Sequence, residues 1–329
     1  MRKNYYIFDN GELKREDNTI YLRTEEEKKP LPVKKVGALH ILGQVDFNTR
    51  FFSFLSQEEV PAHYYNWFDH YAGSFYPQEF LNSGTTLVNQ ALHYDDRDKR
   101  LEISREIVRG ASHNMLENLR YYSRKGKDVG DAIEEIEHFR SKVDDASTPD
   151  EILGTEGKMR KIYYGTFSEI LREGFVLKKR VKQPPDNEVN AMISFGNSML
   201  YTSTLNEIYR THLNPTISYL HEPRERRYSL SLDLSEIFKP IIVDRTIFKL
   251  VNKQLIKRDD FREEMGGCLL SESGKKTFVR EYEDRLEKTV EHESLGRNVS
   301  YQRLLRLEGY KLVKHVSGDD RYRSYRCTR

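Results

Sequence analysis

Cysteine is almost absent from this chain of 329 residues, which contains only Cys268 and Cys327. The two residues lie far apart and form no CxxC pair, so a cysteine-based zinc site and a disulfide framework are excluded. No apolar run approaches the roughly 18 residues of a membrane span, and residues 1–17 lack the pattern of a signal peptide. We therefore expect a cytoplasmic protein with no membrane segment.

Several phosphate and nucleophile motifs are also missing. The sequence contains no GxxxxGK loop, no GxSxG elbow and no GxGxxG turn, which argues against an NTPase, an esterase-type hydrolase and a dinucleotide enzyme. The formal net charge is only +2, so the protein is not a uniformly basic nucleic-acid coat. Any nucleic-acid binding must come from a local concentration of charge.

Residues 1–80 have the composition of β-strands. Apolar and β-branched segments lie on both sides of Asn10-Gly11, a dipeptide that is the strongest short signal for a β-hairpin. A short helix is expected at 48–57, because four apolar residues recur there at helical spacing.

After residue 84 the pattern becomes helical. Thr148 is a good N-cap, Pro149 fits the first helical position and Glu151 completes a capping box, so a helix is expected from there to about residue 171. A further long helix is expected at about 188–211, and the remainder is expected to be helical. The predicted fold is α+β: a small β-rich N-terminal domain at 1–82, a linker near 81–86, and a larger all-α domain at 83–329.

The segment 214–240 carries the strongest chemical signal. His221 lies in a loop-like stretch, and Asp233 and Glu236 follow three residues apart, so both carboxylates project from one helical face. Glu156 is a further candidate, because it lies between Gly154 and Gly157 in an expected helix. Acids combined with one imidazole form a typical divalent-metal site for phosphodiester chemistry.

Simpler interpretations remain open for each of these residues. Arg160, four residues after Glu156, fits a surface ion pair, and a single histidine is more often structural than a ligand. Two interior glycines cost a helix about 1 kcal/mol each, which favours a close backbone approach near Glu156.

Positive charge is concentrated in two places. Arg224, Arg226 and Arg227 follow His221 directly and are suited to clamp phosphates. Residues 301–329 hold eight Lys or Arg against three acids, including Arg321 and Arg323, interleaved with tyrosines that can stack on bases. A solvated surface tail is the alternative explanation of the second group.

The chain as a whole resembles the CRISPR-associated integrase-endonuclease family known as "Cas one", and is most similar to its archaeal and type I-B-like branch. The resemblance rests on GALHILGQVDFNTRFFSFL and YYNWFDHYAGSFYPQEF, on LGTEGKMRKIYY, and on NPTISYLHEPRERRYSLSLDLSEIFKP. These segments are specific because they occur together, in this order and over this length.

The resemblance implies that Glu156, His221 and Glu236 hold a catalytic Mn²⁺ or Mg²⁺, with Asp233 as the other candidate for the third ligand. It implies a metal-dependent DNA endonuclease and integrase that inserts foreign DNA fragments into a CRISPR array, by attack of a 3′-hydroxyl on a repeat phosphodiester. It further implies a homodimer formed through the N-terminal domain, and a heterohexamer with a dimer of the small "Cas two" partner on double-stranded prespacer and repeat DNA.

Two other functions remain open at this point. The first is a non-catalytic nucleic-acid-binding scaffold of a defence complex, in which the acids and the histidine are structural. The second is a metal-dependent phosphoesterase that acts on a smaller substrate.

Overall fold

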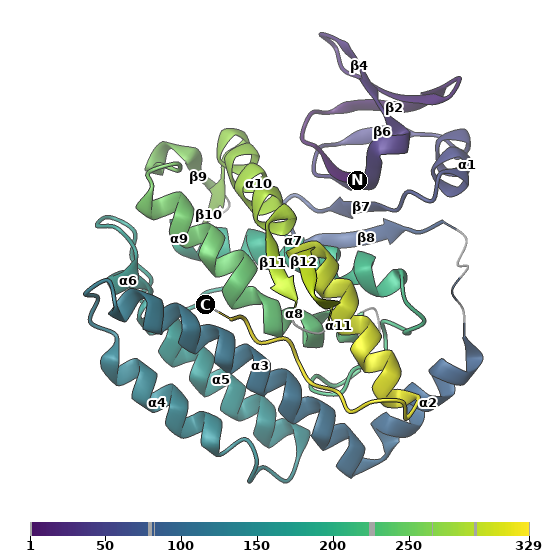
Figure 1. Cartoon of the computed structure of the whole chain (residues 1–329). Coiled ribbons are helices and arrows are strands. Elements are labelled where there is room, and N and C mark those ends of the chain that lie inside the picture. Colours follow the sequence, from purple (N-terminus) through teal and green to yellow (C-terminus); the bar gives the residue numbers. More distant parts are fainter. Residues whose placement is uncertain are drawn as a thin grey trace. The chain divides into compact units, whose positions relative to one another are not determined.

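The computed structural model describes residues 2–77, 81, 83–223, 228–264, 266–292 and 295–328. The chain divides into two compact units, an N-terminal unit at Met1–Asn82 and a C-terminal unit at Ser83–Arg329. Figure 1 shows the first unit in purple to blue and the second from blue to yellow.

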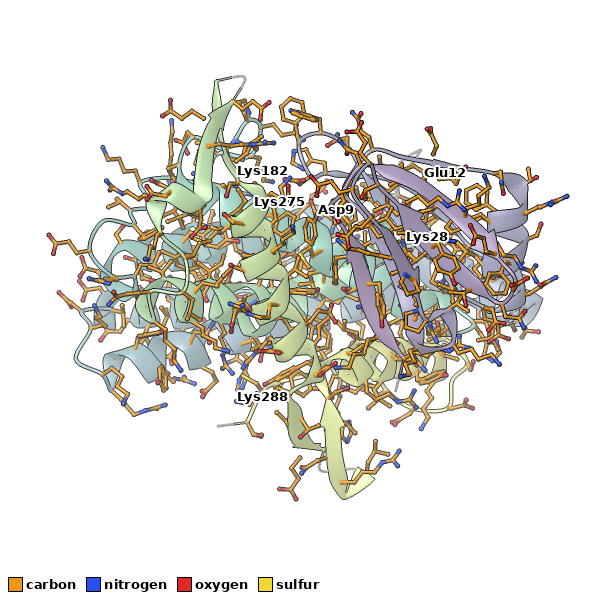
Figure 2. The ribbon with its side chains drawn as sticks, turned by 90° about the horizontal axis from the view of Figure 1, so that it is seen from above. Asp9, Glu12, Lys28, Lys182, Lys275 and Lys288 are labelled. Carbon is orange, nitrogen blue, oxygen red and sulfur yellow. The ribbon has the colours of Figure 1, made fainter. Side chains whose placement is uncertain are left out.

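The N-terminal unit contains two four-stranded sheets. The strands of the first sheet, in spatial order, are β1 (Lys3–Ile7), β5 (Val36–Ile41), β7 (Ala62–Tyr65) and β8 (Tyr71–Phe75). The strands of the second are β4 (Lys28–Leu31), β3 (Thr19–Arg23), β2 (Gly11–Glu16) and β6 (Val45–Phe47). The second sheet carries both acidic and basic side chains, including Glu12 on β2 and Lys28 on β4, which are labelled in Figure 2.

A hydrophobic core holds this unit together. Leu13, Leu39, Phe51 and Leu55 are fully buried and belong to one cluster. The last two lie on α1 (Thr49–Gln57), which begins where the Asn48 side chain accepts a hydrogen bond from the backbone N–H of Phe51. This N-cap satisfies one of the free donors of the first turn, and the helix expected at 48–57 is confirmed.

The hairpin expected at Asn10-Gly11 is wrong. β1 pairs in parallel with β5, whereas β2 pairs with β3 and β6, so the dipeptide connects two different sheets. Gly11 has φ +156°, and a Cβ there would lie 2.1 Å from the Arg23 carbonyl oxygen. The glycine is needed for a close approach of two chain segments rather than for a tight turn.

The C-terminal unit is mostly helical, as expected. Its longer helices are α2 (Gly84–Asp95), α3 (Arg97–Ser123), α4 (Gly130–Ser141), α5 (Pro149–Gly165), α7 (Glu188–Tyr209), α8 (Ser229–Lys239), α9 (Arg245–Asn252), α10 (Glu272–Glu287) and α11 (Tyr301–Val316). A short α6 (Phe167–Ile170) follows α5, and a π-helix (Pro240–Asp244) joins α8 to α9. Over the described residues, no helix has the length and apolar content needed to cross a membrane.

The start of α5 follows the sequence signal with one difference. The Thr148 hydroxyl accepts from the N–H of Glu151, and Pro149 occupies the first turn. In a standard capping box the Glu151 carboxylate would accept from the N–H of the N-cap residue, Thr148. Here it accepts from the N–H of Ser147, one residue earlier. The α5 helix ends at Gly165, and α6 extends the helical segment to Ile170, close to the expected end.

The expectation that everything after residue 240 is helical is wrong. Two hairpins interrupt the helices: β9 (Phe261–Glu264) with β10 (Gly267–Leu270), and β11 (Thr289–His292) with β12 (Arg297–Ser300). Each turn contains a glycine with positive φ, Gly266 at +75° and Gly296 at +58°. Four-residue strands are too short to show a clear alternation in the sequence.

The end of the chain forms a C-terminal strap, residues 321–328. Its backbone is extended along α3, and in Figure 1 it is the yellow trace that leads to the C-terminus. Tyr322 is 1% exposed and donates to Glu308 at 2.7 Å, while the N–H of Cys327 donates to Asn114 at 2.8 Å. Tyr322, which the sequence places in a basic tail suited to a phosphate backbone, is therefore part of the core.

Candidate metal centre

Three parts of the C-terminal unit carry the candidate ligands. Glu156 lies on α5, Glu236 lies on α8, and His221 lies in the loop that precedes α8. Both helices pack on the long α3, so two acids that are 80 positions apart in the sequence face one region. The side chains of Glu156 and Glu236 are 10% and 8% exposed, which means that each charge needs a partner.

Asp233 is used entirely within the protein. Its Oδ2 accepts from the N–H groups of Tyr219 and Leu220 at 2.6 and 2.9 Å, and its Oδ1 accepts from the N–H of His221 at 3.0 Å. Asp233 is fully buried. A carboxylate with this many donors fastens the loop 219–221 to α8 and has little capacity left for a cation.

His221 is oriented by the same carboxylate. Its Nδ1 lies 2.8 Å from Asp233 Oδ1. Burial lowers the pKa of His221, but the hydrogen bond to Asp233 and its negative charge, with that of Glu236, raise it, and the net pKa is above the usual value. A ligating histidine commonly donates one ring N–H to a carboxylate and presents the other nitrogen to the metal. Nε2 is the available ligand atom of His221.

Glu156 and Glu236 meet at the guanidinium of Arg160. Arg160 Nη2 lies 2.8 Å from Glu156 Oε1 and 2.6 Å from Glu236 Oε2, and Nε donates to Glu156 Oε1 at 2.9 Å. Lys239 forms a further ion pair with Glu236. Burial raises the pKa of Glu236, but Lys239, Arg160 and His221 outweigh it and lower the pKa to about 2. Glu236 is therefore a stable carboxylate at neutral pH.

These side chains have the chemistry of a site for a hard divalent cation. Two carboxylates and one imidazole suit Mg²⁺ or Mn²⁺, and His221 has the supporting carboxylate that ligating histidines need. As the side chains stand, no three His, Cys, Asp or Glu groups in the described part of the chain are close enough to hold an ion. Arg160 Nη2 contacts an oxygen of each glutamate, so the guanidinium already occupies these carboxylate oxygens.

The structure corrects two sequence interpretations near Glu156: the close backbone approach at its flanking glycines, and the surface position of its ion pair with Arg160. A Cβ added at Gly154 or Gly157 would meet nothing within 4 Å, so neither glycine is required by a close backbone approach. Arg160 is not a surface partner either, because its side chain is 11% exposed and it contacts Glu236 as well as Glu156. Sequence reasoning overlooked Lys239, although its position three residues after Glu236 would place the two side chains together on one helix.

The residues predicted to bind DNA have different surroundings. Arg224, Arg226 and Arg227 lie outside the described residues. Arg321 is exposed and its Nε lies 2.5 Å from Glu102 Oε1, and Arg323 is exposed on the C-terminal strap. Lys182 and Lys288 are further exposed cations of the C-terminal unit and are labelled in Figure 2.

Known proteins match this chain over almost its whole length. A "CRISPR-associated endonuclease Cas1" from Fusobacterium nucleatum is 45% identical over 326 residues, 99% of this chain and 96% of that protein. A "CRISPR-associated protein Cas1 1" from Methanobrevibacter ruminantium is 48% identical over 321 residues, 98% of this chain and 97% of that protein.

Solved structures match the fold equally well. A CAS1 protein from Thermotoga maritima has a TM-score of 0.90 with 41% identity, covering 98% of this chain and 100% of that one. A casposase bound to integration product has a TM-score of 0.89 with 19% identity, covering 98% of this chain and 92% of that one. A Cas6-RT-Cas1–Cas2 complex has a TM-score of 0.86 with 18% identity, covering all of this chain and 36% of that one. At these low identities the last two matches concern the fold alone.

The family profile described as "CRISPR associated protein Cas1" matches residues 5–284, a range that includes Glu156, His221, Asp233 and Glu236. With this match and the full-length relatives, the chain belongs to the Cas1 family.

Proposed function

We propose that this protein is a metal-dependent DNA endonuclease and integrase, which joins the 3′-hydroxyl of a foreign DNA fragment to a phosphodiester of a CRISPR repeat. The observation that carries the proposal is the pair of buried carboxylates, Glu156 and Glu236, that share the guanidinium of Arg160 beside a histidine oriented by Asp233. The names of the relatives, which describe CRISPR-associated endonucleases, support the same activity.

Glu156, Glu236 and Nε2 of His221 would hold a Mg²⁺ or Mn²⁺ ion, with Asp233 as the residue that positions His221. When bound, such an ion neutralises charge that develops on the phosphoryl oxygens and helps to orient the reacting oxygens. Asp233 keeps Nδ1 of His221 protonated and the ring fixed. Because Glu236 has a low pKa, it stays ionised at neutral pH. Water in place of the DNA hydroxyl gives phosphodiester hydrolysis at the same site.

The DNA backbone would be held by exposed cations, without sequence readout. In this proposal Arg323 and Arg321 of the C-terminal strap contribute to that surface, together with Arg224, Arg226 and Arg227. Since each phosphate contact releases counterions, DNA affinity should fall steeply as the salt concentration rises.

The N-terminal unit is the proposed homodimer contact. It has an open, aromatic-lined groove of about 410 Å³ with Phe47 and Tyr64 on its lining, and both rings are 44% exposed. Exposed apolar surface of this kind is typical of protein interfaces. A Cas6-RT-Cas1–Cas2 complex has the same fold, which supports a "Cas two" partner for this chain. The proposal extends this to a heterohexamer with a "Cas two" dimer.

A strand-transfer assay tests the activity. The purified protein, with and without a Cas2 partner, is mixed with a short duplex bearing free 3′-hydroxyl ends and a plasmid carrying a repeat array, in Mn²⁺ and in EDTA. Joining should require metal and fall at least about 100-fold in Glu156→Ala, His221→Ala and Glu236→Ala. Glu207→Gln is the matched control, because Glu207 is equally buried but pairs with Arg306, and it should retain joining.

A non-catalytic scaffold is the alternative, and the neutralisation of both glutamates by Arg160 and Lys239 is the observation in its favour. Salt-sensitive DNA binding with no joining or cleavage under any metal would establish that function. Full activity of the His221→Ala protein would overturn the ligand set.

A further inference from the structure

Arg160 occupies the place between the two candidate ligand carboxylates. One of its nitrogens, Nη2, lies within 2.8 Å of an oxygen from each of Glu156 and Glu236. All three side chains are at most 11% exposed, so water contributes little to solvating these charges. Together with Lys239, which pairs with Glu236, the guanidinium therefore does what a bound divalent cation would do, which is to neutralise two buried carboxylates that would otherwise repel each other.

A divalent ion cannot simply be added to this arrangement. The ion needs the same carboxylate oxygens, and two cations that share buried ligands repel each other strongly in a poorly solvated site. The guanidinium of Arg160 must therefore move away from at least one glutamate when a metal binds. It remains charged at any accessible pH, so its new position must also supply a negative partner.

Asp244 has the properties of that partner. It is completely buried at the end of the π-helix, and within the described part of the chain neither carboxylate oxygen has a hydrogen-bond partner. The Tyr163 hydroxyl is close enough to lower the pKa of Asp244. Burial raises the pKa of Asp244 to about 7, and Arg160 is the charge that counteracts this most. A buried carboxyl group without a hydrogen bond is rare in folded proteins and calls for an explanation.

The unused atom of the arginine completes the pattern. Arg160 Nη1 is buried and has no hydrogen-bond partner among the described residues, and the Asp244 charge raises the pKa of Arg160. Arg160 and Asp244 therefore attract each other, and each has a buried polar atom that no hydrogen bond satisfies. π-Helical turns often occur at functional sites, and this one carries Asp244 directly after α8, the helix of Glu236.

We propose that Arg160 is an exchangeable counter-ion of the metal centre: it bridges Glu156 and Glu236 in the metal-free protein and transfers to Asp244 when the divalent ion binds. The inference rests on the proposed metal site. It assigns Arg160 and Asp244 as positioning residues that set the affinity for metal and keep the empty site folded, rather than as ligands.

The test measures metal affinity and stability, without DNA. The full chain is titrated with MnCl₂ while free Mn²⁺ is followed by electron paramagnetic resonance, and the melting temperature is recorded in EDTA and in saturating Mn²⁺. The variants are Arg160→Gln, Arg160→Lys, Asp244→Asn and the Arg160→Gln/Asp244→Asn double variant. Arg306→Gln is the matched control, because it removes the arginine partner of another buried glutamate, Glu207.

The two single variants should have opposite effects. Arg160→Gln should bind Mn²⁺ at least about tenfold more tightly, since an ion no longer has to break charge-assisted hydrogen bonds. It should also melt earlier in EDTA and recover more than the wild type on adding Mn²⁺. Asp244→Asn should bind Mn²⁺ about tenfold more weakly, because the displaced guanidinium has no acceptor, and its melting temperature in EDTA should not fall.

The double variant distinguishes two ways in which Asp244 could affect Mn²⁺ affinity. Asp244 could act by accepting the displaced Arg160, or its own negative charge could attract the metal directly. If Asp244 acts through Arg160, Asp244→Asn changes Mn²⁺ affinity less than about twofold when Arg160 is already Gln. An equal loss in both backgrounds, or weaker binding by Arg160→Gln, overturns the proposal. If Arg160→Gln does not fold, Arg160→Lys decides: it keeps the charge with fewer donors and should still bind Mn²⁺ more tightly than the wild type.

Failure of this inference differs from failure of the proposed function. A wild-type protein that binds no Mn²⁺ removes the metal site, and the inference with it. A wild-type protein that binds Mn²⁺ with an affinity unchanged in Asp244→Asn removes only the inference. Arg306→Gln should lower the melting temperature with no change in Mn²⁺ affinity, which shows that loss of a buried ion pair alone does not alter metal binding.

Discussion

Each unit of the chain buries a set of titratable side chains, and the two sets are stabilised in different ways. In the N-terminal unit, His40 on β5 and His63 on β7 are paired in register, with ring centroids 5.1 Å apart. Burial lowers the pKa of His63 to about 3 and that of His40 well below its usual value. Both rings are neutral and use hydroxyl partners, Tyr65 and Ser74.

The C-terminal unit keeps its buried groups charged. Glu156, Glu236 and Arg160 form a connected set of ion pairs, and for Glu236 the effect of burial on the pKa is outweighed by opposite charges. A neutral buried pair requires only hydrogen bonds, whereas a charged set requires a compensating charge at every position. The second kind of site is costly for folding alone, and the proposed metal would replace part of the compensating charge that Arg160 supplies.

The largest expected effect is that of Asp233→Ala. The substitution leaves the N–H groups of Tyr219, Leu220 and His221 without their acceptor and removes the partner of Nδ1. We expect the free energy of unfolding to fall by about 3–5 kcal/mol, and strand transfer to be lost with it. Urea denaturation followed by circular dichroism measures the first quantity. A loss below about 1 kcal/mol would contradict the role assigned to Asp233.

The neutral pair predicts a pH effect. In the unfolded chain both histidines titrate near about 6.5, but in the folded protein they remain neutral at lower pH. The unfolded state therefore takes up more protons as the pH falls, and stability is present above about pH 6.5 and is lost below it. From pH 7 to pH 5, each histidine should cost roughly 2 kcal/mol. Denaturant titrations across this range test the slope, and His40→Phe should reduce it by about half.

Tyr322→Phe tests whether the C-terminal strap also stabilises a buried charged side chain. The Tyr322 hydroxyl donates to Glu308, which is 1% exposed. Since hydrogen bonds to charged groups contribute about 1.5–3 kcal/mol, we expect a loss in that range by thermal or chemical denaturation. Strand transfer by the folded protein should be retained. An unchanged stability would indicate that the strap is not an integral part of the core.

The smallest effects are expected from a matched pair of glycines. Gly157→Ala should stabilise the protein by up to about 1 kcal/mol, because the position is helical and open. Gly110→Ala should destabilise it by about 1–3 kcal/mol, because a Cβ there would lie 2.5 Å from Ser324 Oγ. Melting temperatures of both variants test the pair. If Gly157→Ala destabilised the protein, the result would support a close backbone approach near Glu156, which the structure does not show.

Local signals in the sequence were sufficient for much of the architecture. The N-cap at Thr148, the helix at 48–57 and the change from strands to helices near residue 84 depend on side chains only a few positions apart. The two later hairpins were missed because four-residue strands carry too little periodicity. The Asn10-Gly11 signal was misread because a glycine that allows close approach and a glycine that allows a turn look alike in a sequence.

For the candidate site, too, some features follow from the sequence and others only from the tertiary structure. By itself the sequence determined that Asp233 and Glu236, three residues apart, lie on the same helix and near His221 in the chain, and from this it predicted the candidate ligands. Only the tertiary structure decided what each acid contacts: Asp233 holds the loop before α8, Glu236 meets Arg160 of another helix, and Asp244 is buried beside them without a hydrogen bond. Contacts between distant segments depend on how helices pack, and no local pattern encodes them.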